Sequence, residues 1–406
     1  MKILHVAPAY YPFQERGGPV FKVGALAAGL ARRGHDVTVV TPDLGLEKYA
    51  EIQPQLRKHA FGRRLEREGV EIVYLSTVAQ YRALTLNPSV LGFCRTLLPQ
   101  FDVVHCYGLY DFLGPAVGYF CRSKGISYIV EPMGMYEPID RSIRLKRLWH
   151  GGLGKGFLRG ASKIVATSEL EERELLDAGF PQTQVVVRYN GIDPALLPGL
   201  PSRGTFRTKW GLPQSEPLVL FLSRIIPRKG VDLLIDAFAR ACAETGRLVI
   251  AGPEGERGYL ACLEKRAQES GAGGRILFCG PLYDEDKKAA LRDADIFALP
   301  SRYENFANVA AEAMACGVPV IVTDACGISP LVDGIGGLVI AREHEALTEA
   351  LSSLIRDEAL YARLKEGCRR VAAQLDWGTL TEQMERHYQD SVRGDKGVAV
   401  ALPRLD

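Results

Sequence analysis

The turn at residues 223–230 carries two cations whose types suit a phosphate ligand. Arg224 follows an apolar, strand-like run at 218–223, and Lys229 comes just before a helical pattern at 230–245. A guanidinium can bind two phosphate oxygens at once, an ammonium adds a point charge, and a helix N-terminus offers free N–H groups. The turn therefore predicts a diphosphate site, and the alternative is a solvated basic turn.

Two carboxylates follow a second apolar run, at 295–300. Glu304 lies in the loop after that run, and Glu312 lies in the next helical pattern among small apolar neighbours. A carboxylate in such surroundings is usually paired or bound to a ligand, and it can accept hydrogen bonds from both hydroxyls of a vicinal diol. We interpret Glu312 as a candidate diol-binding residue, and the alternative is an exposed glutamate on a helix.

Paired glycines and a histidine mark strand ends in the first half of the chain. Gly17 and Gly18 follow the first strand-like run and open a helical pattern at about 19–33, where a backbone can approach a phosphate closely. His105 closes the run at 102–105. A lone histidine at a strand end is more often a packed core residue. Because ligands bind at the ends of parallel strands, we nevertheless predict an active-site role for His105.

The elements that must position these residues are short apolar runs separated by helical patterns. The runs lie at 2–7, 36–41, 70–76, 102–107, 127–132, 163–168, 184–190, 218–223, 247–252, 275–280, 295–300 and 318–323. Because they are nearly all apolar rather than alternating, they predict strands that are buried on both faces of parallel sheets. The predicted fold class is therefore α/β, with doubly wound sheets that bind ligands at the carboxyl ends of their strands.

Chain length and one break in the pattern divide the protein into two domains. A chain of 406 residues is too long for one ordinary domain, and residues 194–217 are rich in proline and glycine without periodicity. We predict an N-terminal domain at 1–193, a linker at 194–217, a C-terminal domain at 218–376, and a helix with a frayed tail at 377–406. Two facing sheets would form a cleft for the ligand.

Composition argues against several other classes of protein. A net charge of +2 is too small to indicate a nucleic-acid-binding protein, and nine scattered cysteines without a C-x-x-C pair indicate neither a disulfide framework nor a zinc site. The D-x-D of Asp293 and Asp295 precedes its strand, at the wrong end of the sheet for the ligand, so we expect no metal. With neither a signal peptide nor a membrane-spanning run, the expected location is the cytoplasm.

Taken together, the motifs resemble those of the GT4 family of retaining glycosyltransferases, which have the GT-B fold. Glu304 and Glu312 form the E-x7-E pattern of that family. The similarity covers almost the whole chain in the right order, through Asn190-Gly191-Ile192-Asp193, Ser223-Arg224 with Lys229, Ala251-Gly252-Pro253, Phe278-Cys279-Gly280 and the run at 312–320. It implies two Rossmann-like domains facing a central cleft, with the last helix crossing back to the N-terminal domain.

The resemblance also implies a role for each motif. Arg224 and Lys229 would hold the diphosphate of a nucleotide-diphospho-sugar, Glu312 the ribose, and Glu304 would lie near the donor sugar. His105 would contact the donor sugar or the acceptor. The other donor-binding positions would be Gly17, Gly18, Gly252, Gly280, Leu282, Asn305, Phe306 and Ala307. The family often has glycine at positions 305 and 307, and often a glutamate where Pro330 stands here.

The implied reaction transfers a sugar to the hydroxyl of a saccharide or lipid-linked acceptor without a cofactor, as in bacterial surface polysaccharide or glycolipid assembly. Two alternatives are a nucleotide-sugar epimerase of the same architecture, which needs no acceptor, and a catalytically silent nucleotide-sugar-binding module. The basic and apolar residues at 141–163 indicate either peripheral membrane contact or a solvated helix face.

Overall fold

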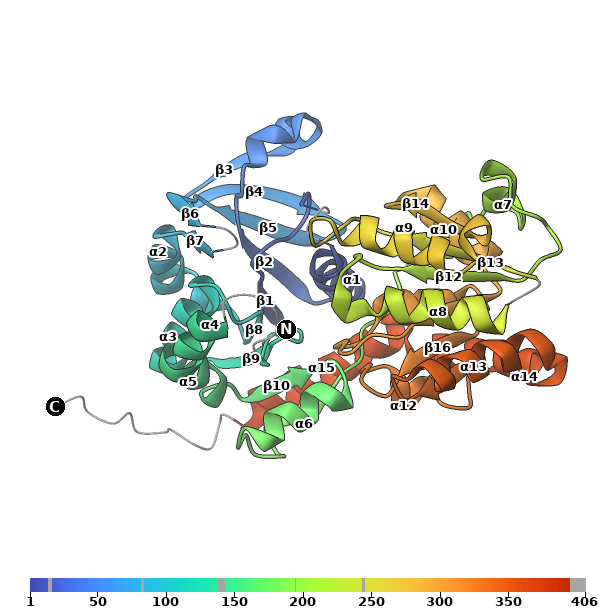
Figure 1. Ribbon diagram of the computed structural model, residues 1–406. Helices are drawn as coiled ribbons and strands as arrows, with labels where there is room; N and C mark the ends of the chain where they lie inside the picture. The colour runs from blue at the N-terminus through green and yellow to red at the C-terminus, as the bar shows by residue number, and fades with distance from the viewer. Residues whose placement is uncertain (14–16, 82–83, 138–142, 194, 243–244, 395–406) are drawn as a thin grey trace. The chain divides into compact units, whose positions relative to one another are not determined.

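The computed structural model describes residues 1–13, 17–81, 84–137, 143–193, 195–242 and 245–394, which form two compact units (Figure 1). Unit 1 consists of Met1–Tyr189 together with the final helix α15 (Trp377–Gly394). Unit 2 consists of Asn190–Asp376. The chain therefore passes between the units twice.

A nine-stranded sheet forms the centre of unit 1, in the order β11-β10-β9-β8-β1-β2-β5-β4-β3. The strands are β1 (Lys2–Val6), β2 (Asp36–Pro42), β3 (Arg57–His59), β4 (Gly62–Arg67), β5 (Val70–Leu75), β8 (Val103–Tyr107), β9 (Ser127–Glu131), β10 (Lys163–Ala166) and β11 (Val185–Val187). Pairing is parallel from β11 to β5, as the apolar runs predicted. The strands β4 and β3 add an antiparallel edge that was not predicted, because their residues are mostly charged and exposed.

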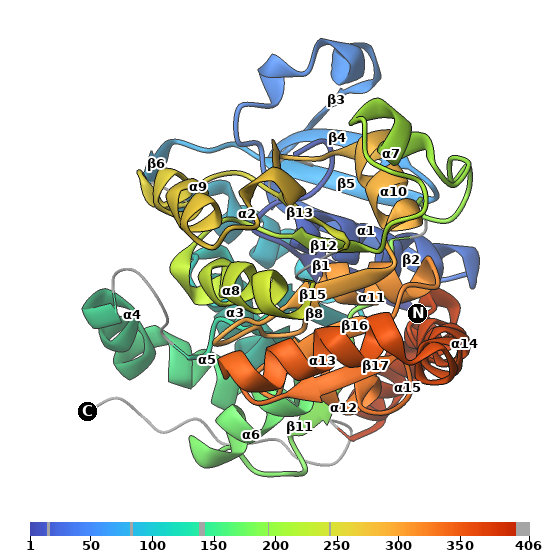
Figure 2. The ribbon, with the colours of Figure 1, turned by 45° about the vertical axis from the view of Figure 1, so that its right-hand side comes forward.

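Helices cover both faces of this sheet and give unit 1 two apolar cores. Ile3 of β1 packs in one core and Leu4 in the other, as alternating side chains of a central strand must. One core takes in α1 (Gly18–Arg32) and α15, and the other takes in α2 (Ser89–Thr96), α3 (Leu113–Lys124), α5 (Lys155–Arg159) and α6 (Glu169–Asp177). The strands β6 (Ala79–Tyr81) and β7 (Leu84–Leu86) pair with each other in a separate two-stranded antiparallel sheet. Helix α4 (Ile143–Trp149) lies at the periphery of unit 1 (Figure 2).

Unit 2 contains a six-stranded, wholly parallel sheet in the order β14-β13-β12-β15-β16-β17. The strands are β12 (Leu218–Leu222), β13 (Arg247–Ala251), β14 (Ile276–Gly280), β15 (Ile296–Leu299), β16 (Val320–Thr323) and β17 (Gly337–Ile340). The helices are α7 (Thr205–Lys209), α8 (Val231–Ala241), α9 (Tyr259–Glu269), α10 (Asp284–Asp293), α11 (Asn308–Ala315), α12 (Ser329–Val332), α13 (His344–Arg356) and α14 (Glu358–Gln374). Of these strands, only β17 was missing from the sequence prediction.

The predicted linker at 194–217 differs from the structure. Described residues of this segment belong to unit 2 and include α7. Arg207 of α7 is buried, and its guanidinium bonds to the Asp295 carboxylate at 2.7 Å and to the carbonyl of Pro213 at 2.6 Å. Although this segment is rich in proline and glycine, its described part packs within unit 2 and is not a separate linker. The division between the units falls after Tyr189, four residues before the predicted boundary.

Candidate functional site

The strand order of unit 2 reverses between β12 and β15, which are the first and fourth strands of that unit along the chain. In doubly wound sheets, ligands bind outside the carboxyl ends of the strands at such a reversal. The turn with Arg224 and Lys229 follows β12, and the loop with Glu304 follows β15. The structure therefore brings the predicted diphosphate turn and the predicted sugar loop to the same edge of one sheet.

Two glycines allow the strand ends to approach one another closely. Gly252, after β13, has a φ of 145°, and a Cβ there would lie 1.8 Å from the carbonyl oxygen of Ser223. Gly230, before α8, has a φ of 73°, and a Cβ there would lie 2.2 Å from the carbonyl oxygen of Pro300. No side chain fits at either position unless the backbone moves. The turn after β12 is thus held against both β13 and the loop after β15.

The end of β14 is tied to the same edge. The Gly252 N–H donates to the Gly280 carbonyl at 2.9 Å, and Gly280 itself has a left-handed backbone with a φ of 74°. Leu282, two residues further on, is buried. These three predicted donor-binding positions therefore lie together, next to the turn that carries Arg224.

The two cations of the turn have different surroundings. Arg224 is exposed, whereas Lys229, in the 3-10 turn Pro227–Lys229, is only 6% exposed. The Lys229 ammonium forms an ion pair with the Glu304 carboxylate. Because a buried charge is costly unless it is paired, this contact stabilises Lys229 and joins the turn after β12 to the loop after β15.

Backbone hydrogen bonds fix the loop that carries Glu304. The Thr323 hydroxyl donates to the Ser301 carbonyl at 2.6 Å. The Glu304 N–H donates to the Ala325 carbonyl at 3.0 Å, and the Gly327 N–H donates to the Glu304 carbonyl at 2.8 Å. Glu304 therefore has a defined position although it lies in a loop.

The same loop enters α11 through a strained residue. Ala307 has a left-handed backbone with φ 76° and ψ 62°, a conformation that a residue with a Cβ adopts only at a cost. Ala307 and Phe306 are buried, and Asn305 is half-buried. The backbone at 307 thus adopts the conformation that glycine favours, although the residue is alanine.

Glu312, in the middle of α11, is 8% exposed and contacts a lysine of the neighbouring helix. Its Oε2 lies 2.7 Å from the ammonium of Lys287 in α10. Burial raises the pKa of the Glu312 carboxyl, and the positive charge of Lys287 opposes that shift. The alternative of an exposed glutamate is therefore excluded for Glu312.

In unit 1, the paired glycines lie at the start of α1. Gly17 precedes the helix with a φ of 80°, and a Cβ there would meet no atom of the described residues within 4 Å. Gly18 is exposed. The space beside Gly17 allows an anion to approach the backbone here, but Pro19 has no N–H and the Val20 N–H already donates to the Gly17 carbonyl at 3.1 Å.

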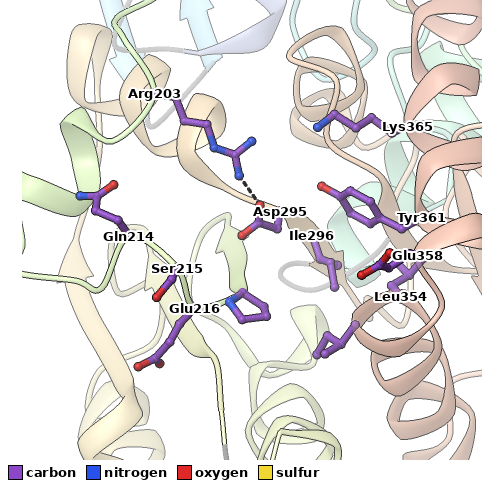
Figure 3. Close-up of a pocket in the computed structure, with 12 residues that line it drawn as sticks. Arg203, Gln214, Ser215, Glu216, Asp295, Ile296, Leu354, Glu358, Tyr361 and Lys365 are labelled. Atoms are coloured by element: carbon purple, nitrogen blue, oxygen red, sulfur yellow. Dashed lines mark hydrogen bonds and ion pairs between the residues drawn. The ribbon is translucent and has the colours of Figure 1, made fainter.

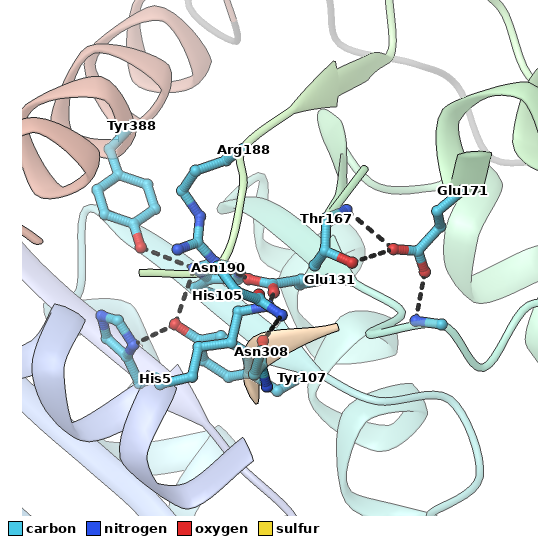
Figure 4. Close-up of polar contacts among 12 residues, drawn as sticks. His5, His105, Tyr107, Glu131, Thr167, Glu171, Arg188, Asn190, Asn308 and Tyr388 are labelled. Carbon is cyan, nitrogen blue, oxygen red and sulfur yellow. Dashed lines mark hydrogen bonds and ion pairs between the residues drawn. The ribbon is translucent and has the colours of Figure 1, made fainter. Parts of the chain in front are cut away.

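His105 lies inside unit 1 rather than at its surface. Its side chain is fully buried, with Nδ1 2.7 Å from the Tyr388 hydroxyl of α15 and 3.1 Å from the Tyr107 hydroxyl (Figure 4). Burial, followed by the charges of neighbouring basic groups, holds the pKa of His105 well below its usual range. The structure therefore favours the alternative of a packed core histidine, because the side chain does not reach solvent to touch a sugar.

Sequence reasoning missed the charged cluster beneath His105. Glu131, at the end of β9, is fully buried and pairs with Arg188 at 2.5 Å and with Lys22 of α1, and His105 Nε2 lies 3.6 Å from the same carboxylate. Glu131 is the last residue of β9, and Arg188 directly follows the apolar residues of β11. A charge at that place was the signal that could have found them.

Comparisons with known proteins decide the family. The profile of the family described as glycosyl transferases group 1 matches residues 202–371, and the profile of the glycosyl transferase 4-like domain matches residues 17–191. The chain belongs to the GT4-type group 1 glycosyltransferases. It is a transferase that acts on glycosyl groups.

Relatives of this glycosyltransferase match most or nearly all of its length. It is 29% identical to a phosphatidyl-myo-inositol mannosyltransferase of Mycobacterium leprae, over 99% of this chain and 100% of that protein. It is 27% identical to an uncharacterized glycosyltransferase of Methanocaldococcus jannaschii, over 79% of this chain and 80% of that protein. The structure of HepE from Anabaena with UDP and glucose superimposes with a TM-score of 0.71 at 21% identity, covering 96% of this chain and 100% of HepE. This likeness shows the GT-B fold, with two Rossmann-like domains.

The D-x-D of the glycosyltransferase has structural partners. Asp293 is buried and accepts from the N–H of Arg207 at 2.9 Å, while Asp295 accepts from the N–H of Leu218 at 2.9 Å. Asp295 also pairs with Arg203. Both aspartates lie at the amino ends of the strands, opposite the edge that carries Arg224 and Glu304.

A pocket of about 320 Å³ opens at this amino edge (Figure 3). Arg203, Asp295, Tyr361 and Lys365 are among its lining residues. Because it lies at the opposite edge of the sheet from the strand reversal, we do not place the donor there.

Proposed function

We propose that this glycosyltransferase is a retaining enzyme that uses a nucleotide-diphospho-sugar as donor. The observation that carries the proposal is the convergence of Arg224, Lys229, Glu304 and Glu312 at the carboxyl edge of one sheet, where its strand order reverses. Two cations suit a diphosphate, and two carboxylates suit the hydroxyls of a ribose and a sugar. The two carboxylates follow one another across the loop and first turns of α11, so donor sugar and ribose would bind side by side.

Positioning and charge stabilisation would carry the reaction. As the bond between the anomeric carbon and the diphosphate breaks, Arg224, Lys229 and the nearby helix N-termini would stabilise the developing negative charge. The acceptor hydroxyl would attack the same face of the sugar, and its proton would pass to the leaving phosphate. In the Lys229–Glu304 pair, the ammonium would then bind the phosphate and the carboxylate would bind the sugar.

The test combines ligand screening with product stereochemistry. Thermal shifts with UDP, GDP and ADP identify the base, since a ligand at 100 times its dissociation constant stabilises the folded protein by about 2.7 kcal/mol. The matching nucleotide-sugar is then supplied with and without saccharide and lipid-linked acceptors. A product with the donor's anomeric configuration supports the proposal. An inverted product, or conversion of the donor sugar without any acceptor, contradicts it.

We propose further that transfer needs no metal ion. Asp293 and Asp295 bond to arginines and backbone N–H groups at the amino edge of the sheet, and the cations of the donor edge are side chains. Activity should therefore persist in EDTA. Loss of activity that Mg²⁺ or Mn²⁺ restores would contradict this proposal.

We also propose that unit 1 contacts an anionic membrane through α4 and the π-helical turn that follows it (His150–Gly154). Leu145, Leu148 and Leu153 of this segment are 57%, 74% and 52% exposed, and the adjacent Arg144 and Arg147 are exposed as well. No helix among the described residues could cross a bilayer. Leucines that enter the interface and arginines that meet anionic headgroups would give a peripheral contact, which suits a lipid-linked acceptor.

Vesicle flotation tests the membrane contact. The protein should float with phosphatidylglycerol-containing vesicles at low salt and less with pure phosphatidylcholine, and Leu148→Ser should weaken flotation. Leu91→Ser is the matched control, because Leu91 is an exposed leucine of α2 in the same unit. Equal flotation of the two variants would exclude α4 as the contact.

A further inference from the structure

The buried carboxylate of Glu312 has one cation beside it from a different helix. Lys287 projects from the first turns of α10, and its ammonium lies 2.7 Å from Glu312 Oε2. The side chain of Glu312 is 10% exposed and that of Lys287 is 28% exposed, so the pair lies at the margin of the protein interior rather than in bulk solvent. An ion pair in this setting is screened less by water than one on the surface.

Other charged groups around α11 favour protonation of Glu312 or lie further along the helix. Asp193, in the segment before α7, raises the pKa of Glu312 by its negative charge. Cys316, the residue directly after α11, lines a pocket together with charged residues of α10 and α14, namely Arg292, Lys365, Glu366 and Arg369. The strands β15 and β16, which also pack on α11, carry no titratable side chain. Lys287 is thus the cation in direct contact with the carboxylate.

A ribose diol needs this carboxyl in its ionised form. A carboxylate offers lone pairs on both oxygens, so one ammonium and two hydroxyls can share it, whereas a neutral acid must use one oxygen as a donor. Burial works against the ionised form, and contact with an ammonium works for it. The orientation matters as well, because the contact from α10 restrains the rotamer of a side chain on α11.

We propose that Lys287 is a positioning residue of the donor site, whose ammonium keeps the Glu312 carboxyl ionised and oriented to accept both hydroxyls of the donor ribose. The inference rests on the proposed role of Glu312. It adds a residue outside the E-x7-E motif, from a helix that carries none of the predicted donor-binding residues.

The first measurement follows the carboxyl of Glu312 directly. In protein labelled with ¹³C at glutamate carboxyls, the Glu312 signal is assigned by its loss in Glu312→Gln and is then titrated in wild type and in Lys287→Met. The titration midpoint of Glu312 should be higher in Lys287→Met than in wild type. Lys288→Met is the matched control, because Lys288 is the next residue and pairs with Glu285 instead, at 2.9 Å. An unchanged midpoint in Lys287→Met would overturn the inference, and Lys287→Gln replaces the methionine variant if that variant does not fold.

The second measurement reads the consequence for the ribose. The probes are the nucleoside diphosphate that gives the largest thermal shift with wild type and its 2′,3′-dideoxy form. At a pH below the raised midpoint, Lys287→Met should prefer the nucleoside diphosphate over its 2′,3′-dideoxy form about tenfold less than wild type does. An effect of about tenfold is what the loss of one charge-assisted hydrogen bond gives. Wild type and Lys288→Met should keep the full preference. Lys287→Arg should restore it, because the guanidinium retains the charge.

The two measurements separate the inference from the proposal beneath it. If Glu312→Gln keeps the full preference for the ribose form, the ribose role of Glu312 fails. If Glu312→Gln loses that preference but Lys287→Met keeps it at every pH, only the role of Lys287 fails.

Discussion

Lys229 is the buried cation of the donor edge, and its pairing with Glu304 makes it the most informative single residue there. Lys229→Met keeps the length of the side chain and removes the charge. If the ammonium supplies about 3 kcal/mol of charge stabilisation in the transition state, kcat/KM should fall by roughly 10²-fold. Steady-state kinetics with the identified donor measure this.

The control for Lys229→Met is Lys265→Met, which removes an exposed lysine of α9 that pairs with Glu269. Because Glu304 loses a partner in Lys229→Met, the melting temperature of each variant must be measured alongside. Turnover like that of wild type in a folded Lys229→Met protein would refute the phosphate role.

Substitution by glycine should affect the free energy of unfolding differently at Ala307 and at Ala310, three residues further on. Relief of the left-handed strain in Ala307→Gly offsets the greater chain entropy of glycine in the unfolded state, so its free energy of unfolding should stay unchanged or rise by up to about 1 kcal/mol. In Ala310→Gly, inside α11, the free energy of unfolding should fall by at least about 1 kcal/mol. Urea unfolding of both variants decides, and a large loss in Ala307→Gly would show that its methyl packing outweighs the strain.

At the scale of single residues, the sequence predicted which residues lie at the carboxyl edge of unit 2, but it did not reveal that the His105 side chain is buried. Local sequence patterns predict the order of strand, turn and helix, and this order brings four residues to one edge of the sheet, namely Arg224, Lys229, Glu304 and Glu312. Whether His105 faces solvent depends on what covers it. Tyr388 covers it from a helix 283 residues away in the chain, and no local pattern carries that information.

Among the elements, α15 forms part of the polar interior of unit 1 through Tyr388. Tyr388→Phe should lower the free energy of unfolding by about 1 kcal/mol, because the hydroxyl that contacts His105 is lost while the Tyr107 hydroxyl remains within 3.1 Å. Tyr119→Phe, at an exposed position of α3, should have no effect. If Tyr388→Phe is also without effect, the contact with His105 does not stabilise the unit.

Helix α3 begins at a buried carboxylate that predicts a pH dependence of stability. Asp111 accepts from the Gly114 N–H at 2.7 Å, and burial, only partly opposed by such hydrogen bonds, raises the pKa of Asp111 to about 6. Because this pKa is higher in the folded than in the unfolded protein, the stabilisation is present below about pH 4 and is lost as the pH rises through 6. The shift of about two units corresponds to a loss of about 3 kcal/mol in the free energy of unfolding.

Asp111→Asn tests this sign, since the amide does not titrate. The variant should lose the contribution of Asp111 to the decline in stability between pH 4 and pH 7, measured by urea unfolding at each pH. A parallel decline in variant and wild type would assign the pH dependence to other groups.

Strands that are buried on both faces could be predicted from the sequence, whereas strands that are buried on one face could not. Strands such as β12 and β15 are buried along their whole length and appear in the sequence as apolar runs. The strand β4, which lies next to the edge strand β3, buries only Leu65, so its charged residues indicate a loop as readily as a strand. The α7 segment was misread for a related reason, because Arg207 is buried by ion pairs that composition does not reveal.

The whole molecule is built so that the chain leaves unit 1 after Tyr189 and re-enters it at Trp377. Helix α15 then buries Trp377, Leu380, Met384 and Tyr388 in the core shared with α1 and β8. Full burial of one large apolar side chain contributes about 1.5–3 kcal/mol, so the four together are comparable to the entire stability of a typical domain. Unit 1 should therefore depend on the last helix, although 187 residues of unit 2 separate it from the rest of its core.

Truncation after Asp376 tests this dependence, with truncation after Gly394 as the matched control. The shorter protein should lose amide-exchange protection in β1, β8, β9 and α1, whereas β12, β13 and β15 should keep theirs, because their core lies within unit 2. The control should exchange like the full chain. In the protein that ends at Asp376, nucleotide binding at the donor edge should be reduced less than sugar transfer. Equal loss of protection in both units would mean that α15 stabilises the molecule in some other way than by completing the core of unit 1.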